Sequence, residues 1–162
     1  MTLTKVISGG QTGIDRGALD AALRAGFACG GWCPPGRIAE DGRIPDRYPL
    51  QEMPRGSYRQ RTVRNVADSD GSVVIHFGQP KGGTQLTLLE CIKLGKPYLL
   101  IDAGETPADL AASELAAFIE EQGVATLNVA GPRASENSNA YRYAFDFVTG
   151  LLRVQQATSE KS

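Results

Sequence analysis

Apolar and polar residues follow two alternating periods along this chain. Short apolar runs at 5–7, 72–77, 98–102 and 125–130 predict buried strands, and a weaker run spans 27–33. Between them, helical spacing predicts helices at 15–25, 57–68, 85–94, about 107–122 and about 139–152. Strands that alternate with helices form βαβ units. We therefore predict an α/β domain over residues 1–154, with a mostly parallel sheet of about five or more strands, helices on both faces, and a polar tail at 155–162.

Two glycine-rich turns each follow a predicted strand and precede a predicted helix. Gly9, Gly10 and Gly13 lie in the first turn, and Gly82 and Gly83 in the second. Glycine lets a ligand approach the backbone, and a helix start offers free N–H groups and the positive end of the helix dipole. Each turn therefore predicts a phosphate site. Neither is a Walker A or Gly-x-Gly-x-x-Gly motif, so a turn without a ligand is the alternative.

Both turns leave the carboxyl ends of their strands, where parallel sheets bind ligands, so we expect them to share one crevice. Thr12 and Thr84 are the predicted N-caps, and Asp15 has capping-box spacing from Thr12. A third loop after 125–130 adds Arg133 or Ser135 to the same edge. The predicted ligand-binding residues are Gly9, Gly10, Gln11, Thr12, Gly13, Asp15, Gly82, Gly83, Thr84 and Thr87.

The helix at 57–68 carries a polar stripe that is most often a solvated face. The stripe comprises Arg61, Arg64, Asn65 and Asp68, and we expect the core-facing side to comprise Val63, Val66 and Ala67. On the helix at 85–94, Glu90 suits a sugar hydroxyl, a proton transfer, or an ion pair with Arg61 or Arg64.

Residues 34–56 show no helix or strand period and contain five prolines and three glycines. Such a long loop in a compact domain is usually functional or disordered. We interpret it as an ordered flap near the site. A solvated excursion that only covers the sheet is nearly as well supported.

Composition narrows the function classes. The 162 residues include 17 Lys plus Arg and 18 Asp plus Glu, so there is no basic field for a nucleic-acid partner. No apolar run spans a bilayer and no leader opens the chain, so we expect no membrane partner and a cytoplasmic location. The three cysteines and one histidine form no disulfide framework or zinc site, and we predict no protein-bound metal. We expect His76 to be satisfied by a backbone partner.

The segment Ser8–Ala18 (SGGQTGIDRGA) resembles the opening of the molybdenum-cofactor carrier family. Tyr58–Gly71 resembles its middle, and Gly82-Gly83-Thr84 and Arg43-Ile44-Pro45 fit as well. That family is similar to a Rossmann-like group that includes the lysine-decarboxylase-like phosphoribohydrolases and the DNA-processing protein A domain. The resemblance covers the chain to about residue 152 and implies a single Rossmann-like three-layer domain.

The resemblance implies a carrier of molybdenum cofactor (molybdopterin), or a relative that binds a nucleotide-like ligand. The cofactor brings its own dithiolene sulfurs to the metal, so the protein supplies a phosphate cradle, polar groups for the pterin and a cover. Relatives of this shape also imply a homodimer or homotetramer. The DNA-processing relatives imply single-stranded DNA binding, against which the near-neutral charge argues.

The alternative is an N-glycosidic phosphoribohydrolase. That group carries Pro-Gly-Gly-x-Gly-Thr-x-x-Glu and an upstream Arg. Pro80, Gly82, Gly83 and Thr87-x-x-Glu90 resemble a version one residue longer, and Arg61 stands where the upstream Arg falls. If the protein is an enzyme, Arg61 and Glu90 are the predicted catalytic residues. The second Gly-Thr of the signature is missing, and Glu90 is shifted relative to the loop.

Overall fold

The structure is a computed structural model that describes residues 2–161. Its centre is a five-stranded sheet in the order β2-β1-β9-β7-β8, and all of these strands run parallel. The strands are β1 (Lys5–Ile7), β2 (Cys29–Gly30), β7 (Gly71–His76), β8 (Tyr98–Asp102) and β9 (Thr126–Ala130). The predicted α/β fold with a mostly parallel sheet is therefore confirmed.

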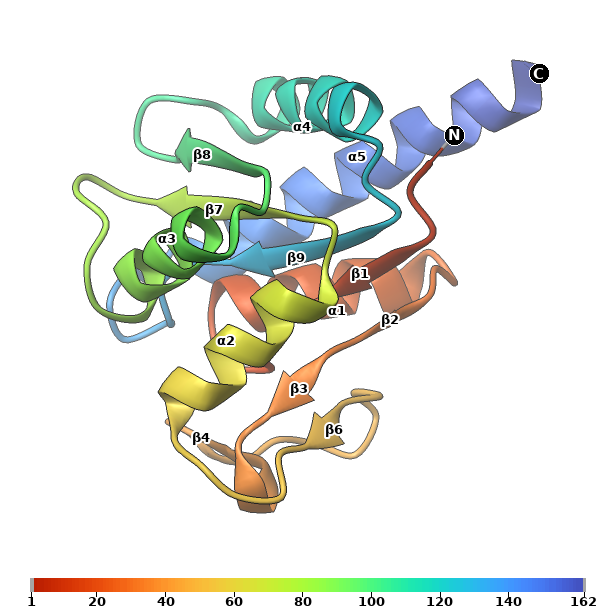
Figure 1. Cartoon of the computed structure of the whole chain (residues 1–162). Coiled ribbons are helices and arrows are strands. Elements are labelled where there is room, and N and C mark those ends of the chain that lie inside the picture. The colour runs from red at the N-terminus through yellow and green to blue at the C-terminus, as the bar shows by residue number, and fades with distance from the viewer. Residues whose placement is uncertain (1, 162) are drawn as a thin grey trace.

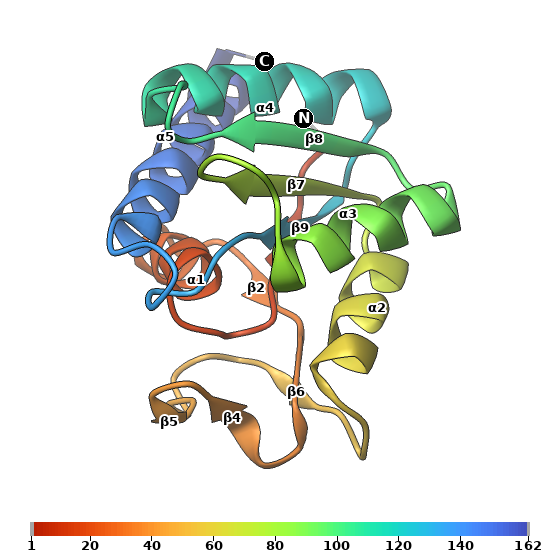
Figure 2. The ribbon, with the colours of Figure 1, turned by 90° about the vertical axis from the view of Figure 1, so that its left-hand side faces the viewer.

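Helices cover both faces of the sheet, which makes three layers (Figures 1 and 2). One face carries α1 (Ile14–Arg24), α4 (Ala108–Gln122) and α5 (Ala140–Lys161), and α5 packs against both other helices. The other face carries α2 (Tyr58–Asp68) and α3 (Gly82–Leu94), which pack on each other. Since β7 lies between both layers, Val73, Val74 and Ile75 are fully buried.

The predicted strand at 27–33 is split between two sheets. Cys29 and Gly30 pair with β1, whereas β3 (Trp32–Cys33) leaves the main sheet and pairs with β6 (Gln51–Glu52). This departure carries the chain into residues 34–56, which we call the flap. The flap lies beyond the β2 edge of the sheet and is the lowest part of Figure 1.

The flap contains short regular elements, so the prediction that it has none is wrong. They are a 3-10 helix η1 (Pro35–Arg37) and a two-stranded ladder of β4 (Ile38–Ala39) and β5 (Gly42–Arg43), in addition to β6. A small core of its own contains Cys33, Ala39, Ile44 and Tyr48 together with Leu19 of α1. Strands of two residues are too short to show a period, which explains the error.

Arg37 organises the flap from within. Its guanidinium is buried and donates hydrogen bonds of 2.7–3.3 Å to the backbone carbonyls of Ile44, Pro45, Tyr48 and Leu50. One fixed cation thus satisfies carbonyls that no strand partner reaches. The flap is therefore an ordered unit, as expected.

The predictions that Thr12 and Thr84 are N-caps are wrong. Ser57 caps α2 in a capping box with Gln60. The N-cap of α1 is Gly13, and that of α3 is Lys81. The Thr12 hydroxyl instead donates to Glu40 of the flap and accepts from the backbone N–H of Ala134 at 3.1 Å. The Thr12 hydroxyl therefore bonds to residues distant in the chain, and it does not cap α1 as the local spacing predicted.

The last helix is longer than predicted. α5 continues to Lys161 through most of the expected polar tail, and Gln155 is buried on it. Ser162 of that tail lies outside the described residues. Within residues 2–161, no helix combines the length and the apolarity needed to cross a bilayer.

Candidate functional site

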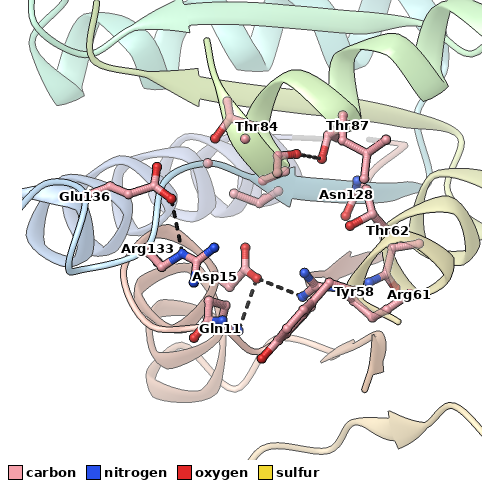
Figure 3. A pocket seen from close by; sticks show the side chains of 18 residues that line it. Gln11, Asp15, Tyr58, Arg61, Thr62, Thr84, Thr87, Asn128, Arg133 and Glu136 are labelled. Atoms are coloured by element: carbon pink, nitrogen blue, oxygen red, sulfur yellow. Dashed lines mark hydrogen bonds and ion pairs between the residues drawn. The ribbon is translucent and has the colours of Figure 1, made fainter. Parts of the chain in front are cut away.

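One pocket of about 220 Å³ lies at the carboxyl ends of the strands (Figure 3). The β1–α1 loop, the start of α3, the β9–α5 loop and the inner face of α2 form its walls. Its lining comprises Gly9, Gln11, Asp15, Tyr58, Arg61, Thr62, Asn65, Gly82, Gly83, Thr84, Leu86, Thr87, Asn128, Val129, Ala130, Gly131, Arg133 and Glu136.

The two glycine turns therefore do share one crevice. Of the predicted ligand-binding residues, Gly9, Gln11, Asp15, Gly82, Gly83, Thr84 and Thr87 line it, and so does Arg61. Gly10, Thr12, Gly13 and Glu90 are not among its lining residues. The third loop contributes Arg133, whereas Ser135 donates from its backbone N–H and its hydroxyl to Glu40.

Most backbone N–H groups of the first glycine turn are already hydrogen-bonded within the protein, so few of them can bind a ligand. The backbone N–H of Gln11 donates to Asp15, that of Thr12 to the Gln11 side chain, and that of Ile14 to the Pro132 carbonyl. Gly9 lies against Arg61 so closely that a Cβ there would be 1.7 Å from its Nη1. The glycine is needed because the arginine, and not a ligand, approaches the backbone.

The second glycine turn is open. Gly82, Gly83 and Thr84 form the first turn of α3, whose N–H groups have no acceptor within the helix. No side chain caps this end, and a Cβ at Gly83 would meet nothing within 4 Å. The positive end of the α3 dipole thus faces the pocket unobstructed.

Arg61 and Asp15 form a buried pair on the opposite wall (Figure 3). Their side chains are 12% and 9% exposed, and Arg61 Nη1 lies 3.5 Å from Asp15 Oδ2. Burial raises the pKa of Asp15 to about 6, although Arg61 and the N–H groups of Gln11 and Gly9 act in the other direction. Arg61 Nε is buried and has no hydrogen-bond partner among residues 2–161. Such a donor is costly unless a ligand satisfies it.

Neutral polar groups form part of the remaining pocket lining. Thr87 donates to the carbonyl of Gly83 at 3.0 Å, and Asn128 on β9 donates its amide N–H to Ser72 at 3.1 Å. Thr62 is buried beside them on α2. Sequence reasoning missed both residues, because Thr62 is one of many polar residues along α2 and Asn128 lies inside the apolar run of β9. On the third loop, Arg133 pairs with Glu136 at 3.1 Å.

The polar stripe on α2 is not a solvated face throughout. Asn65 is buried, and its amide exchanges hydrogen bonds of 2.8 and 3.0 Å with the backbone of Trp32. Ala67, predicted to face the core, is exposed. The buried face of α2 is thus rotated relative to the predicted one, because Trp32 of β3 supplies hydrogen-bond partners that allow Asn65 to be buried. Arg64 remains at the surface, with its guanidinium 4.4 Å from the centre of the Trp32 ring.

Glu90 is buried on α3 away from this pocket. None of the ion pairs within the described part of the chain joins it to Arg61 or Arg64. The ion pair, one of the three roles considered for Glu90, is therefore not formed, and the structure does not bring Glu90 and Arg61 together as lining residues of one site.

Other candidate chemistry is accounted for locally. Burial raises the pKa of the Cys29, Cys33 and Cys91 thiols, which disfavours the reactive thiolate. His76 Nδ1 contacts the carbonyl of Gly78, so its expected backbone partner is confirmed. Residues 2–161 contain no group of three or more His, Cys, Asp or Glu side chains that could hold a metal ion.

Comparisons with known proteins agree with this architecture. The model of the circularly permutated YpsA SLOG family matches residues 6–152. The chain is also similar to a crystal structure from Syntrophus aciditrophicus SB described as a "putative molybdenum carrier protein". The two are 43% identical, with a TM-score of 0.90, over 93% of this chain and 96% of that one. Comparison with curated proteins gave no match.

Proposed function

We propose that the pocket of this chain, which belongs to the circularly permutated YpsA SLOG family, binds a small phosphorylated ligand and carries it without turnover. Molybdenum cofactor is the ligand that we favour, and a nucleotide is the alternative. The observation that carries the proposal is the unpartnered, buried Nε of Arg61 in the same pocket as the open start of α3. A phosphate would satisfy both sets of donors.

The remaining lining residues suit the rest of such a ligand. Thr62, Thr87 and Asn128 offer neutral hydrogen-bonding groups for a pterin or a base. The pocket, at about 220 Å³, is smaller than the roughly 300–1,000 Å³ typical of sites for drug-sized ligands. We therefore expect it to enclose the phosphate and only part of the ring system. The molybdenum-carrier description of the Syntrophus protein supports this choice of ligand.

The phosphoribohydrolase alternative, in the form that assigns the carboxylate role to Glu90, gains no support from the site. That mechanism requires Glu90 next to the sugar, and Glu90 does not line the pocket. Loss of base release in Glu90→Ala would revive that alternative.

We also propose that the chain forms a homodimer or homotetramer. Large apolar side chains are exposed on α3 (Leu89, Ile92) and on the edge strand β8 (Tyr98, Leu100). Such a surface is typical of contacts between copies. Light scattering that gives a monomer mass at micromolar concentration would contradict this proposal.

Two arginines three residues apart on α2 provide a matched test of binding. Arg61→Met removes the buried donor, whereas Arg64→Met removes an exposed arginine outside the pocket. We expect Arg61→Met to weaken binding of inorganic phosphate, GMP or isolated molybdenum cofactor at least about tenfold, because charge-assisted hydrogen bonds are lost. Arg64→Met should bind as the unmodified protein does.

Binding is measured as saturable thermal stabilisation and confirmed by calorimetry. Gly83→Leu provides a second test, since it fills open space at the α3 start without meeting protein atoms within 4 Å of its Cβ. Equal binding by all variants, or no saturable binding of any phosphorylated probe to the unmodified protein, would refute the proposed function.

A further inference from the structure

Asp15 is an unusual neighbour for an anion. It lies in the pocket wall, its side chain is 9% exposed, and its Oδ2 accepts from the Gln11 N–H at 3.2 Å. The same oxygen lies 3.5 Å from Arg61 Nη1. A ligand phosphate held by Arg61 would therefore share one guanidinium with a buried carboxylate.

We propose that anion binding in this pocket is coupled to protonation of Asp15, so that the protein holds its ligand more tightly in mildly acidic solution. This inference rests on the proposed function and concerns how pH regulates ligand binding in the same pocket. The physical reason is that two anions cannot share one buried cation without strong mutual repulsion. Protonation of the carboxylate removes that repulsion.

The other charged groups around Asp15 are already paired, so Asp15 is the group that takes up a proton when an anion binds. Arg61 faces it from α2, and Arg16 is the nearby cation on α1 itself. Arg16 is held elsewhere, since it donates to Asp41 of the flap at 2.7 Å and to the Gly10 carbonyl at 3.1 Å. Across the pocket, Arg133 and Glu136 neutralise each other.

The carboxyl group needs only a small further change to take up a proton at neutral pH. Burial has already raised its pKa to about 6 in the ligand-free protein. An anion nearby raises the pKa further, and diversion of Arg61 to the ligand adds to the shift. When the anion binds, Asp15 takes one proton from the solvent, one O–H bond forms, and the carboxylate becomes a neutral carboxylic acid.

Linkage gives the expected size of the effect. Above the pKa of free Asp15 and below that of the complex, each unit of pH lowers the observed affinity by up to about tenfold. Ligand phosphates titrate in the same range, with a second pKa of about 6, so they are unsuitable probes. Sulfate is a tetrahedral dianion without this complication, and we choose it as the probe.

The test is calorimetric titration of sulfate into the full chain, in two buffers of different ionisation enthalpy, from about pH 5.5 to about pH 7.5. We expect uptake of a large fraction of one proton near neutral pH, and an affinity that falls as pH rises. Asp15→Asn should bind sulfate without proton uptake and without this pH dependence, at least as tightly as the unmodified protein at neutral pH. Asp68→Asn removes a carboxylate outside the pocket and should keep the uptake.

The outcomes separate the two proposals. Sulfate binding by the unmodified protein without proton uptake overturns the role of Asp15 and leaves the anion pocket intact. Failure of sulfate, phosphate and GMP to bind at any pH overturns both. The two-buffer measurement uses the unmodified protein alone, so it decides the question even where Asp15→Asn folds poorly.

Discussion

Asp15→Asn should become more stable relative to the unmodified protein as pH rises from about 4 to about 7, whatever the pH-independent cost of removing the partner of Arg61. Burial raises the pKa of this group from 3.8 to about 6, so the folded state binds more protons than the unfolded state between these values. Stability from Asp15 is thus complete below about pH 4 and is lost as pH rises through about 6. About two pKa units at about 1.4 kcal/mol each give a cost of about 3 kcal/mol at pH 7. Asn cannot ionise and avoids this cost.

The assay is urea unfolding of both proteins, followed by circular dichroism at steps from about pH 3.5 to about pH 7. The stability difference between Asp15→Asn and the unmodified chain should grow by about 3 kcal/mol across this range, or about 6 to 12 °C in Tm for a chain of this length. Asp146→Asn, which replaces a half-exposed carboxylate on α5, should change the difference by less than about 0.5 kcal/mol. A stability difference for Asp15→Asn that does not vary with pH would refute the reasoning.

Two further predictions concern the supports of the site. Arg37→Met should destabilise the protein by about 3 kcal/mol or more and expose the flap to limited proteolysis, because four carbonyls lose a buried cationic donor; a flap as resistant as in the unmodified protein would contradict this. Gly13→Ala should cost about 2 kcal/mol or more in chemical unfolding, since φ is +81° and the new Cβ would be 2.5 Å from the Pro132 carbonyl oxygen. Gly83→Ala is the control in open space and should stay within about 1 kcal/mol; equal costs at the two positions would contradict the packing argument.

The sequence by itself determined the layered architecture and the place of the pocket. Apolar runs separated by amphipathic helices admit few arrangements other than a parallel sheet with two helical layers. The carboxyl ends of parallel strands then bring Gly9 and Gly83 to one edge, although 74 positions separate them in the chain. These conclusions depend only on local periodicity and on the handedness of connections, and both are encoded within short windows.

Only the tertiary structure decided which groups a ligand can reach. Spacing alone made both glycine turns equal candidates, but the Asp15 and Gln11 side chains and the distant Pro132 carbonyl occupy amides of the first turn, whereas no side chain caps the second. The pairing of Arg61 with Asp15, 46 positions apart, and the burial of Asn65 against Trp32 likewise depend on partners from other elements. On a helix each residue turns the side chain by about 100°, so a small change in packing decides that Thr87 lines the pocket while the equally buried Glu90 does not. Hydrogen-bond partners and rotational phase are set by the packed neighbours, and no local window of sequence contains them.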